Sequence, residues 1–211
     1  MKFVLIGQSP AVLAAARVIR SSAAEGEIVI ISCDGKLPYD RGLLPRLISR
    51  RVKEKELFAE AEEFVRSSGV SLVVDREISR INFNRRRIFL SEKQNLDYDV
   101  LVMADAPQVR LPGLKGIRRS GVFHLARLES VKGLVRYLPF VETVVVEVRS
   151  LQGLEAALAL REQGKDVLVT SDQDRLLAGE LDEASGKVLA FLLEKIGIRS
   201  ILNNAFEDLL G

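Results

Sequence analysis

The stretch that decides the fold is Phe3-Val4-Leu5-Ile6-Gly7-Gln8-Ser9-Pro10. Its first four residues form a continuous apolar run, which is typical of a buried parallel strand. Gly7-Gln8-Ser9 is a turn, and Pro10 suits the first position of a helix because proline has no N–H group to leave unpaired. Apolar residues then recur at helical spacing, and a second apolar run, Ile28–Ile31, follows. The pattern predicts a right-handed βαβ unit.

The same pattern returns in the second half of the chain. Thr143–Val146 is the expected strand, Val148-Arg149-Ser150 the turn, Leu151–Gln163 the helix and Val167–Thr170 the next strand. Between the two modules, alternating residues on both sides of Asn84-Arg85 indicate a hairpin.

These modules predict an α/β fold with two Rossmann-like, doubly wound parallel-sheet modules and a small β-hairpin element. Leu111-Pro112-Gly113 marks the boundary. We therefore expect two domains, one over residues 1–111 and one over residues 112–211.

Composition excludes several functional classes. The chain has 211 residues, with 31 Lys and Arg against 29 Asp and Glu, so its formal net charge is only +2. This balance argues against a nucleic-acid binder, and no nucleic-acid partner is expected. A single cysteine and a single histidine, Cys33 and His124, exclude an internal disulfide and any cysteine- or histidine-rich metal site. We expect no bound metal, and we interpret His124 as a structural residue.

The apolar runs are short. None approaches the roughly 20 residues that a membrane helix needs, so no membrane association is expected. The N-terminal apolar stretch is broken by Gln8-Ser9-Pro10, which argues against a secretory signal. We expect a cytoplasmic protein.

Several short motifs, taken in order, resemble those of the FAD- and NAD(P)H-dependent pyridine nucleotide-disulfide oxidoreductase superfamily. The branch that the chain is most similar to contains the nitrite reductase large subunits and the rubredoxin and ferredoxin reductases. That branch lacks a redox cysteine pair, in agreement with the single Cys33. The motifs are Phe3–Gly7, Pro38-Tyr39-Asp40-Arg41 with Leu44, Tyr98–Val102, Leu111-Pro112-Gly113, Gly121-Val122-Phe123, Gly153–Ala157, and Asp174–Leu177 with Leu181-Asp182.

The resemblance implies two dinucleotide sites: residues 1–111 would be an FAD-binding-like domain and residues 112–211 an NAD(P)-binding-like domain. Onto this sequence it places the cofactor-binding positions Gly7, Ser9, Pro10, Asp34, Arg41, Arg46, Ala104, Gly153 and Glu155. Asp34 is the expected ribose-binding acid, while Arg41 and Arg46 are the expected basic residues beside the diphosphate and flavin. Glu155 is either a site residue of this kind or an ordinary helix surface charge. The resemblance identifies no catalytic residue.

Both loops depart from the glycine fingerprint. Its glycines provide a tight turn, a close backbone approach to the diphosphate, and close packing of helix on strand. The first loop keeps Gly7 but has Ser9 and Val12 at the second and third positions. Near the family's later turn, Asp105 and Ala106 replace residues that admit the cofactor.

The second loop departs further. It has Val148-Arg149-Ser150 where the family has a run of glycines, and only Gly153 remains. Glu147 adds a negative charge at the end of the strand, and Ser171 stands where the ribose-binding acid belongs. NAD(P)H binding is therefore expected to be lost.

Two hypotheses of function remain, and a third has less support. The chain is an FAD-dependent pyridine-nucleotide oxidoreductase-like protein or a fragment of one, because family members continue past the second module. Alternatively, it is a catalytically inactive relative that acts as a binding or scaffold subunit, covered by a protein partner or by a second copy of itself. The third hypothesis is a sensor that binds an adenine nucleotide at the first loop.

Overall fold

The computed structural model describes residues 1–23, 25–32, 35–74, 78–91, 94–104, 113–204 and 206–209. The chain divides into two compact units, each described separately below. Unit 1 consists of Met1–Asp40 and Glu54–Gln108, and unit 2 consists of Arg41–Lys53 and Val109–Gly211.

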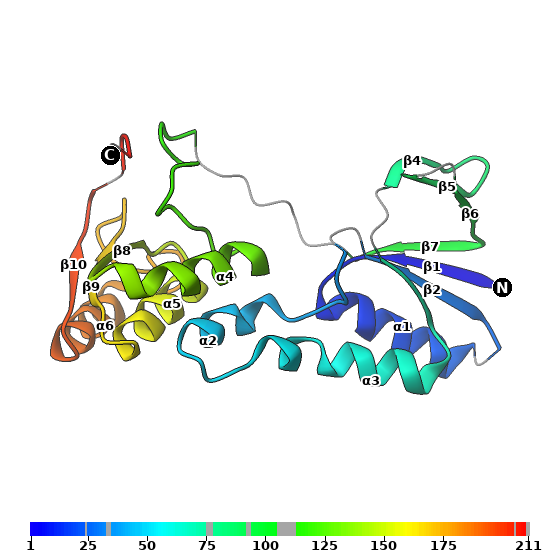
Figure 1. Ribbon diagram of the computed structural model, residues 1–211, viewed down its shortest axis with the longest axis horizontal. Helices are drawn as coiled ribbons and strands as arrows, with labels where there is room; N and C mark the ends of the chain where they lie inside the picture. The colour runs from blue at the N-terminus through cyan, green and yellow to red at the C-terminus, as the bar shows by residue number, and fades with distance from the viewer. Residues whose placement is uncertain are drawn as a thin grey trace. The chain divides into compact units, whose positions relative to one another are not determined.

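Unit 1 is built on a four-stranded parallel sheet in the order β3-β2-β1-β7 (Figure 1). This is the 3-2-1-4 order of a doubly wound fold. The strands of this sheet are β1 (Lys2–Ile6), β2 (Glu27–Ile31), β3 (Ser71–Val73) and β7 (Val100–Met103). The helices of the unit are α1 (Pro10–Ser22), the 3₁₀ turn η2 (Glu54–Leu57) and α3 (Ala59–Ser68).

A second, antiparallel sheet belongs to the same unit. It has the order β4-β5-β6, with β4 over Ile78–Asn82, β5 over Arg87–Leu90 and β6 over Asn95–Asp97. The expected hairpin is thus confirmed and gains a third strand.

The parallel sheet of unit 1 has an apolar cluster on each face. On one face, Leu5 and Ile30 pack with Val12 of α1 and Phe64 of α3. On the other face, Val4 and Ile31 pack with residues of the antiparallel sheet, including Ile88 and Leu90. Because strand side chains alternate between faces, unit 1 has three layers: helices, parallel sheet and antiparallel sheet.

Unit 2 repeats the parallel architecture with a three-stranded sheet in the order β10-β9-β8 (Figure 1). Its strands are β8 (Thr143–Glu147), β9 (Asp166–Thr170) and β10 (Ile198–Ile201). Its helical elements are η1 (Arg41–Leu43), α2 (Leu44–Ile48), α4 (Leu128–Tyr137), η4 (Leu138–Phe140), α5 (Leu151–Glu162) and α6 (Glu183–Lys195). Both expected βαβ modules are confirmed.

The short helix α2 lies in unit 2 although unit 1 surrounds it in the sequence. It packs against α4 and α5, and its Leu44 and Ile48 are fully buried. Gln163, after α5, donates a hydrogen bond to the carbonyl oxygen of Ser49 (3.3 Å), and Arg51 forms an ion pair with Glu162 (2.6 Å). The domain boundary near residue 111 stays a prediction, but the structure assigns residues 41–53 to the second unit.

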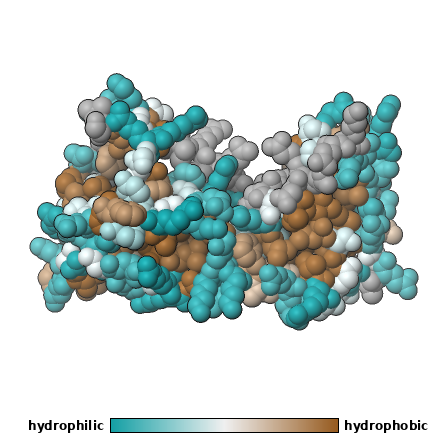
Figure 2. Space-filling model, viewed as in Figure 1, coloured by the Kyte–Doolittle hydropathy of each residue, from teal (hydrophilic) through white to brown (hydrophobic). Residues whose placement is uncertain are grey.

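Apolar groups also reach the surface. Figure 2 shows patches of hydrophobic residues between hydrophilic ones on the viewed face. Phe140 and Val145 of unit 2 are among the exposed large hydrophobic residues. Among the described residues, none of the helices combines the length and apolarity that crossing a bilayer demands.

Candidate functional site

The first dinucleotide loop lies at the carboxyl end of β1. The Gly7 amide donates to the carbonyl oxygen of Ile31 (3.1 Å), which extends the pairing of β1 and β2 into the turn. Ser9 is the N-cap residue of α1, yet its side chain makes no capping hydrogen bond. Instead the Ser9 hydroxyl donates to the carbonyl oxygen of Ala104 (3.1 Å), just after β7. The structure therefore brings Gly7, Ser9, Pro10 and Ala104 together.

The N-terminus of α1 has fewer donors for an anion than a regular helix. Pro10 has no amide hydrogen, and the Val12 amide donates to the Ser9 carbonyl oxygen (3.1 Å). Val12 itself is fully buried in the cluster between α1 and the sheet. The loop keeps a helix N-terminus, which favours an anion, but has few free N–H groups to bind one.

The remaining expected residues of the first site either lie outside the described residues or belong to unit 2. Asp34, Asp105 and Ala106 lie outside the described residues. Arg41 and Arg46 belong to unit 2, where the Arg41 carbonyl oxygen accepts a hydrogen bond from Gln152 (2.9 Å). Arg46 is exposed on α2. The structure therefore does not test the grouping of Asp34, Arg41 and Arg46 with the first loop.

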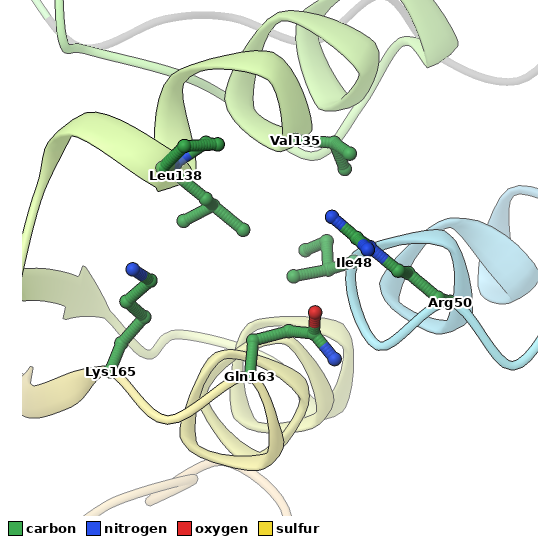
Figure 3. Close-up of a pocket in the computed structure, with 7 residues that line it drawn as sticks. Ile48, Arg50, Val135, Leu138, Gln163 and Lys165 are labelled. Carbon is green, nitrogen blue, oxygen red and sulfur yellow. The ribbon is translucent and has the colours of Figure 1, made fainter.

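A small cavity lies beside α2 within unit 2. Figure 3 shows Ile48, Val135 and Leu138 around it, and its volume is about 120 Å³. Its lysine, Lys165, donates to the carbonyl oxygen of Val141 (2.9 Å). The cavity is much smaller than a nucleotide, so we interpret it as a packing defect between helices.

The residues of the second dinucleotide loop are held by contacts with one another and with the end of β9. Val148, at the first glycine position, is fully buried, and its amide donates to the Thr170 carbonyl oxygen (2.9 Å). The Arg149 guanidinium donates to Glu147 Oε1 from both Nε (3.0 Å) and Nη2 (2.8 Å). Arg149 Nη2 also lies 3.2 Å from Asp172 Oδ2. Hydrogen bonding to Glu147 raises the pKa of Arg149, which therefore stays charged.

Asp172 was not among the expected site residues. It follows β9, whose last residue Thr170 pairs with Glu147 at the end of β8. Since both strands end at the same edge of a parallel sheet, residues just beyond them meet there. Opposite charges at two consecutive strand ends were the signal that could have identified this contact.

Gly153 allows the helix to pack closely on the strand, which is one of the three roles of the fingerprint glycines. A Cβ atom there would lie 3.3 Å from the Glu147 carbonyl oxygen and 3.4 Å from Val148 Cα, so α5 approaches the strand end closely. Glu155, two residues later on α5, is half-buried. Both readings of Glu155 stay open.

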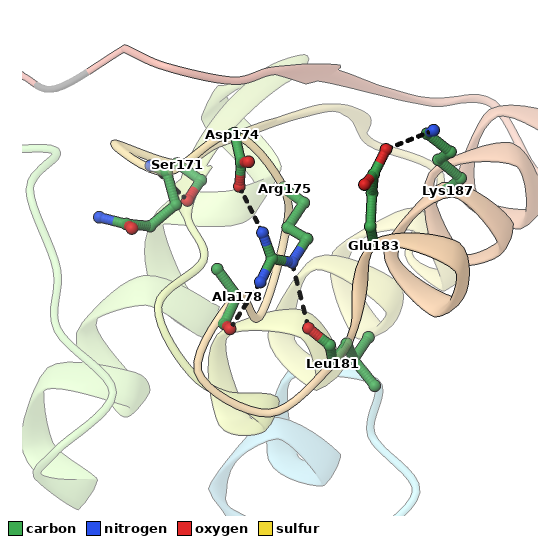
Figure 4. A network of polar contacts seen from close by, with 8 residues as sticks. Ser171, Asp174, Arg175, Ala178, Leu181, Glu183 and Lys187 are labelled. Carbon is green, nitrogen blue, oxygen red and sulfur yellow. Dashed lines mark hydrogen bonds and ion pairs between the residues drawn. The ribbon is translucent and has the colours of Figure 1, made fainter.

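The family's ribose-acid position lies in a buried, hydrogen-bonded segment. Ser171 is buried, and its hydroxyl accepts the amide of Gln173 (3.2 Å). Beyond it, Arg175 holds the loop after β9, because it donates to Leu181 O (3.1 Å), Ala178 O (3.2 Å) and Asp174 Oδ1 (2.8 Å) (Figure 4). Asp182 then caps α6 by accepting the Ser185 amide (2.7 Å). These hydrogen bonds stabilise the loop. Position 171 itself is a serine, so it provides no carboxylate for a ribose.

A large apolar cavity of about 650 Å³ adjoins the second loop. Its lining includes Glu147, Arg149 and Ser150 of the loop together with all of β8. His124 also lines it, and its Nδ1 atom is buried without a hydrogen-bond partner among the described residues. Burial, and secondarily the charge of Arg127, lowers the pKa of His124, so the imidazole is neutral at pH 7. Within the described part of the chain, no group of three or more metal-ligating side chains is present.

The two loops differ in how well their residues suit a dinucleotide. At the second loop, side chains stand at the three glycine positions, and two carboxylates lie against the single guanidinium of Arg149. At the first loop, Gly7 and the N-terminus of α1 are the groups that would accept the diphosphate of FAD, with few free N–H groups and with Ser9 narrowing the approach.

Comparison with known proteins supports this architecture. A family model described as "Pyridine nucleotide-disulphide oxidoreductase" matches residues 1–211. NADH oxidase of Methanocaldococcus jannaschii is 25% identical over 219 residues, covering 100% of this chain and 49% of the relative. Rubredoxin-NAD(+) reductase of Ectopseudomonas oleovorans is 27% identical over 212 residues, covering 100% and 55%. The chain thus spans about half the length of the curated relatives it matches.

A solved structure shares the fold. The NAD-dependent persulfide reductase of A. fulgidus superposes with a TM-score of 0.91 at 22% identity, over 100% of this chain and 41% of that chain.

Proposed function

Because the chain belongs to the pyridine nucleotide-disulphide oxidoreductase family, we propose that it is an FAD-linked oxidoreductase-like protein whose second unit does not bind NAD(P)H. The observation that carries this proposal is the Arg149 ion-pair cluster across the ends of β8 and β9. The proposal is the same whether the given sequence is a fragment of a longer protein or a complete short form.

Both shape and charge oppose a dinucleotide at the second loop. A bound diphosphate needs backbone N–H groups that it can approach closely, and Val148, Arg149 and Ser150 each place a side chain there. Glu147 and Asp172 contribute two negative charges against the one positive charge of Arg149. A diphosphate would therefore meet a net negative cluster at the place where family fingerprints present bare amides.

FAD is the cofactor that the first unit would hold. Gly7, Ser9 and Pro10 would bind its diphosphate at the N-terminus of α1, with Ala104 beside them. Asp34 is the proposed ribose ligand, while Arg41 and Arg46, which belong to unit 2, are cations for the diphosphate and flavin only by the family resemblance. When bound, FAD supplies two-electron redox chemistry, and the protein's part is to position it and exclude water.

The test is a pair of titrations on the purified chain. We expect FAD to bind with quenched flavin fluorescence, and we expect NADH and NADPH to produce no binding heat at millimolar concentration. Dithionite should bleach the bound flavin while NADH should not. Bleaching by NADH would contradict the proposal, and so would measurable NADH binding.

A catalytically inactive scaffold subunit is the second candidate. It is favoured by the side chains at the glycine positions of the second loop and by the Ser9 hydroxyl, which is already bonded to Ala104. The name of one relative, rubredoxin-NAD(+) reductase, includes a protein acceptor, so a protein partner fits either candidate. If the purified chain takes up no added FAD, the result supports the scaffold function. A cytoplasmic location and the absence of a nucleic-acid partner stay predictions.

A further inference from the structure

The hairpin of β4 and β5 in unit 1 is rich in arginine. Residues 78–91, all of which the structure describes, contain Arg80, Arg85, Arg86 and Arg87 but no lysine, aspartate or glutamate. Figure 1 shows the antiparallel sheet on the side of β1, β2 and β7 opposite to α1 and α3. The hairpin is therefore a positively charged part of the outer layer of this unit.

Two of the four arginines have partners within the antiparallel sheet. Arg87 donates to the Asp97 carboxylate from both Nε and Nη2, the latter at 2.8 Å. The Arg80 guanidinium lies 4.4 Å from the centre of the Phe89 ring. The side chains of Arg85 and Arg86 are exposed and make no hydrogen bond or ion pair with the residues that the structure describes.

The backbone of the turn is held in place by hydrogen bonds. The Arg86 amide donates to the Phe83 carbonyl oxygen (3.3 Å), and the Arg86 carbonyl oxygen accepts the amide of Tyr98 (3.0 Å). Arg86 has a φ of 48°, in the left-handed region that glycine or asparagine adopts with less strain. The turn gains nothing from an arginine at this position, which points to a role for its side chain outside the turn.

An exposed aromatic ring accompanies the two unpaired arginines. Phe83, at the same turn, is 66% exposed. Aromatic residues and arginine are enriched where proteins bind one another, whereas lysine, aspartate and glutamate are depleted there. A guanidinium also differs from an ammonium group because its planar fork can bind both oxygens of a carboxylate. This composition is that of a contact surface for carboxylates.

The turn is remote from the first dinucleotide loop. Tyr98, which is bonded to Arg86, lies just before β7, and the next residue, Asp99, accepts the amide of Lys2 at the start of β1 (2.6 Å). The dinucleotide loop follows the other end of β1, which is five residues long. A strand of that length spans about 16 Å, so the two features lie at opposite ends of the parallel sheet.

We infer that Phe83, Arg85 and Arg86 form a tip that binds an acidic segment of a partner protein, with carboxylates against the arginines and an apolar side chain against the ring. Binding at this tip is independent of cofactor binding. One aromatic ring and a few cations give only marginal affinity for a lipid bilayer. A nucleic acid attracts a protein through many phosphate contacts, and the net charge of this chain is only +2.

The probe is a fluorescein-labelled peptide with the sequence Asp-Glu-Leu-Glu-Glu-Leu-Asp-Glu. Its anisotropy is measured against the full chain, and the matched peptide has each acid replaced by its amide. We expect the acidic peptide to bind at least about tenfold more tightly than the amide peptide. In the NMR spectrum of the full chain, amide signals of residues 83–86 should shift and those of Gly7 and Gln8 should not. Absence of binding, or shifts confined to other residues, would overturn the inference.

A first variant separates binding from folding. Arg86→Asn removes the charge but suits the left-handed backbone, so it should be at least as stable as the parent chain while its peptide affinity falls about fivefold. Arg50→Asn is the matched control, because Arg50 is also exposed with a φ of 59° but belongs to unit 2. Unchanged affinity of Arg86→Asn, or an equal loss in Arg50→Asn, would overturn the inference.

A second variant tests the aromatic contact. Phe83→Ala should weaken peptide binding at least about threefold, whereas Phe140→Ala, which removes an 82% exposed ring from unit 2, should not. Equal effects of the two changes would contradict a site at the tip.

Two further titrations identify the class of partner. Vesicles that contain phosphatidylserine and a short DNA duplex are compared with the acidic peptide, each against the parent chain and Arg86→Asn. We expect both to bind more weakly than the peptide. Tighter binding of either, lost in Arg86→Asn, would assign the tip to a membrane or to a nucleic acid and overturn the protein partner.

Discussion

The guanidinium of Arg149 lies 3.2 Å from the carboxylate of Asp172, so a residue after β8 is joined to a residue after β9. Glu147 accepts two further hydrogen bonds from the same group. Side chains of this chain thus occupy the carboxyl edge of the sheet where doubly wound proteins bind their ligands.

Replacing Arg149 by alanine should not restore NADH binding. Val148 and Ser150 still obstruct the loop, and Glu147 and Asp172 then face it without a counter-charge. Since the ion pairs are partly exposed, the free energy of unfolding should fall by no more than about 1 kcal/mol. Calorimetric titration and urea denaturation measure both effects. Arg199→Ala, which breaks an exposed pair with Asp166 on the same sheet, is the matched control. Appearance of NADH binding would show that Arg149 alone closes the loop.

Replacing Ser9 by alanine should destabilise unit 1 by about 1 kcal/mol, because the Ala104 carbonyl loses its hydrogen bond. Ser9→Gly should lose the same bond but bind FAD more tightly than Ser9→Ala, since the Cβ atom no longer narrows the diphosphate approach. Flavin fluorescence and thermal unfolding distinguish the two effects. Ser21→Ala removes an exposed hydroxyl bonded within α1 and serves as the control. Tighter FAD binding by the alanine variant would refute the steric argument.

Replacing Gly153 by alanine should crowd α5 against the end of β8, because the new methyl group meets backbone atoms at 3.3 and 3.4 Å. Overpacking of this kind costs about 1–3 kcal/mol. Gly179→Ala is a suitable control, since its Cβ position is open and it should change the unfolding free energy by less than about 0.5 kcal/mol. Equal stability of the two variants would mean that the helix moves freely away from the strand.

The stability of unit 2 should depend on His124 at mildly acidic pH. Burial lowers the pKa of this histidine in the folded state, so the unfolded chain binds the proton more readily. The contribution of neutral His124 to the free energy of unfolding is therefore complete above the unfolded pKa of about 6.5, and it is lost as the pH falls below that value. Denaturation midpoints measured from pH 8 to pH 5 should fall less in His124→Gln than in the parent chain. Parallel pH profiles for both proteins would rule out this role.

Asp182 should stabilise the start of α6 in a pH-dependent way. The hydrogen bond from the Ser185 amide lowers the pKa of its carboxyl group, so its contribution is present above about pH 4 and disappears as acid protonates it. Asp182→Ala should lower the melting temperature at pH 7, whereas Asp182→Asn should retain most of the cap. Identical melting temperatures for the alanine and asparagine variants would contradict capping.

The fold was largely predictable because it depends on local patterns. The apolar runs at Phe3–Ile6 and Ile28–Ile31, each ended by a turn, identify buried parallel strands without further information. Strand β6 was not expected, because Asn95-Leu96-Asp97 is short and mostly polar. Helix α4 was not expected either, although its apolar residues face the interior at helical spacing.

The site was less predictable because its contacts join distant residues. The loss of glycines at Val148 and Ser150 is visible in the sequence, but the bond from Arg149 to Asp172 depends on the register of β8 and β9. The same is true of the Ser9 contact with Ala104, which depends on β7 pairing with β1. The placement of α2 in unit 2 has no local signal.

The position of α2 in the chain also affects how the protein is made. Leu44 and Ile48 leave the ribosome well before α4 and α5, the helices that bury them. At roughly 5–20 residues per second, these side chains remain uncovered for several seconds while the intervening chain is synthesised. The second unit therefore cannot complete its core during translation until α5 has emerged.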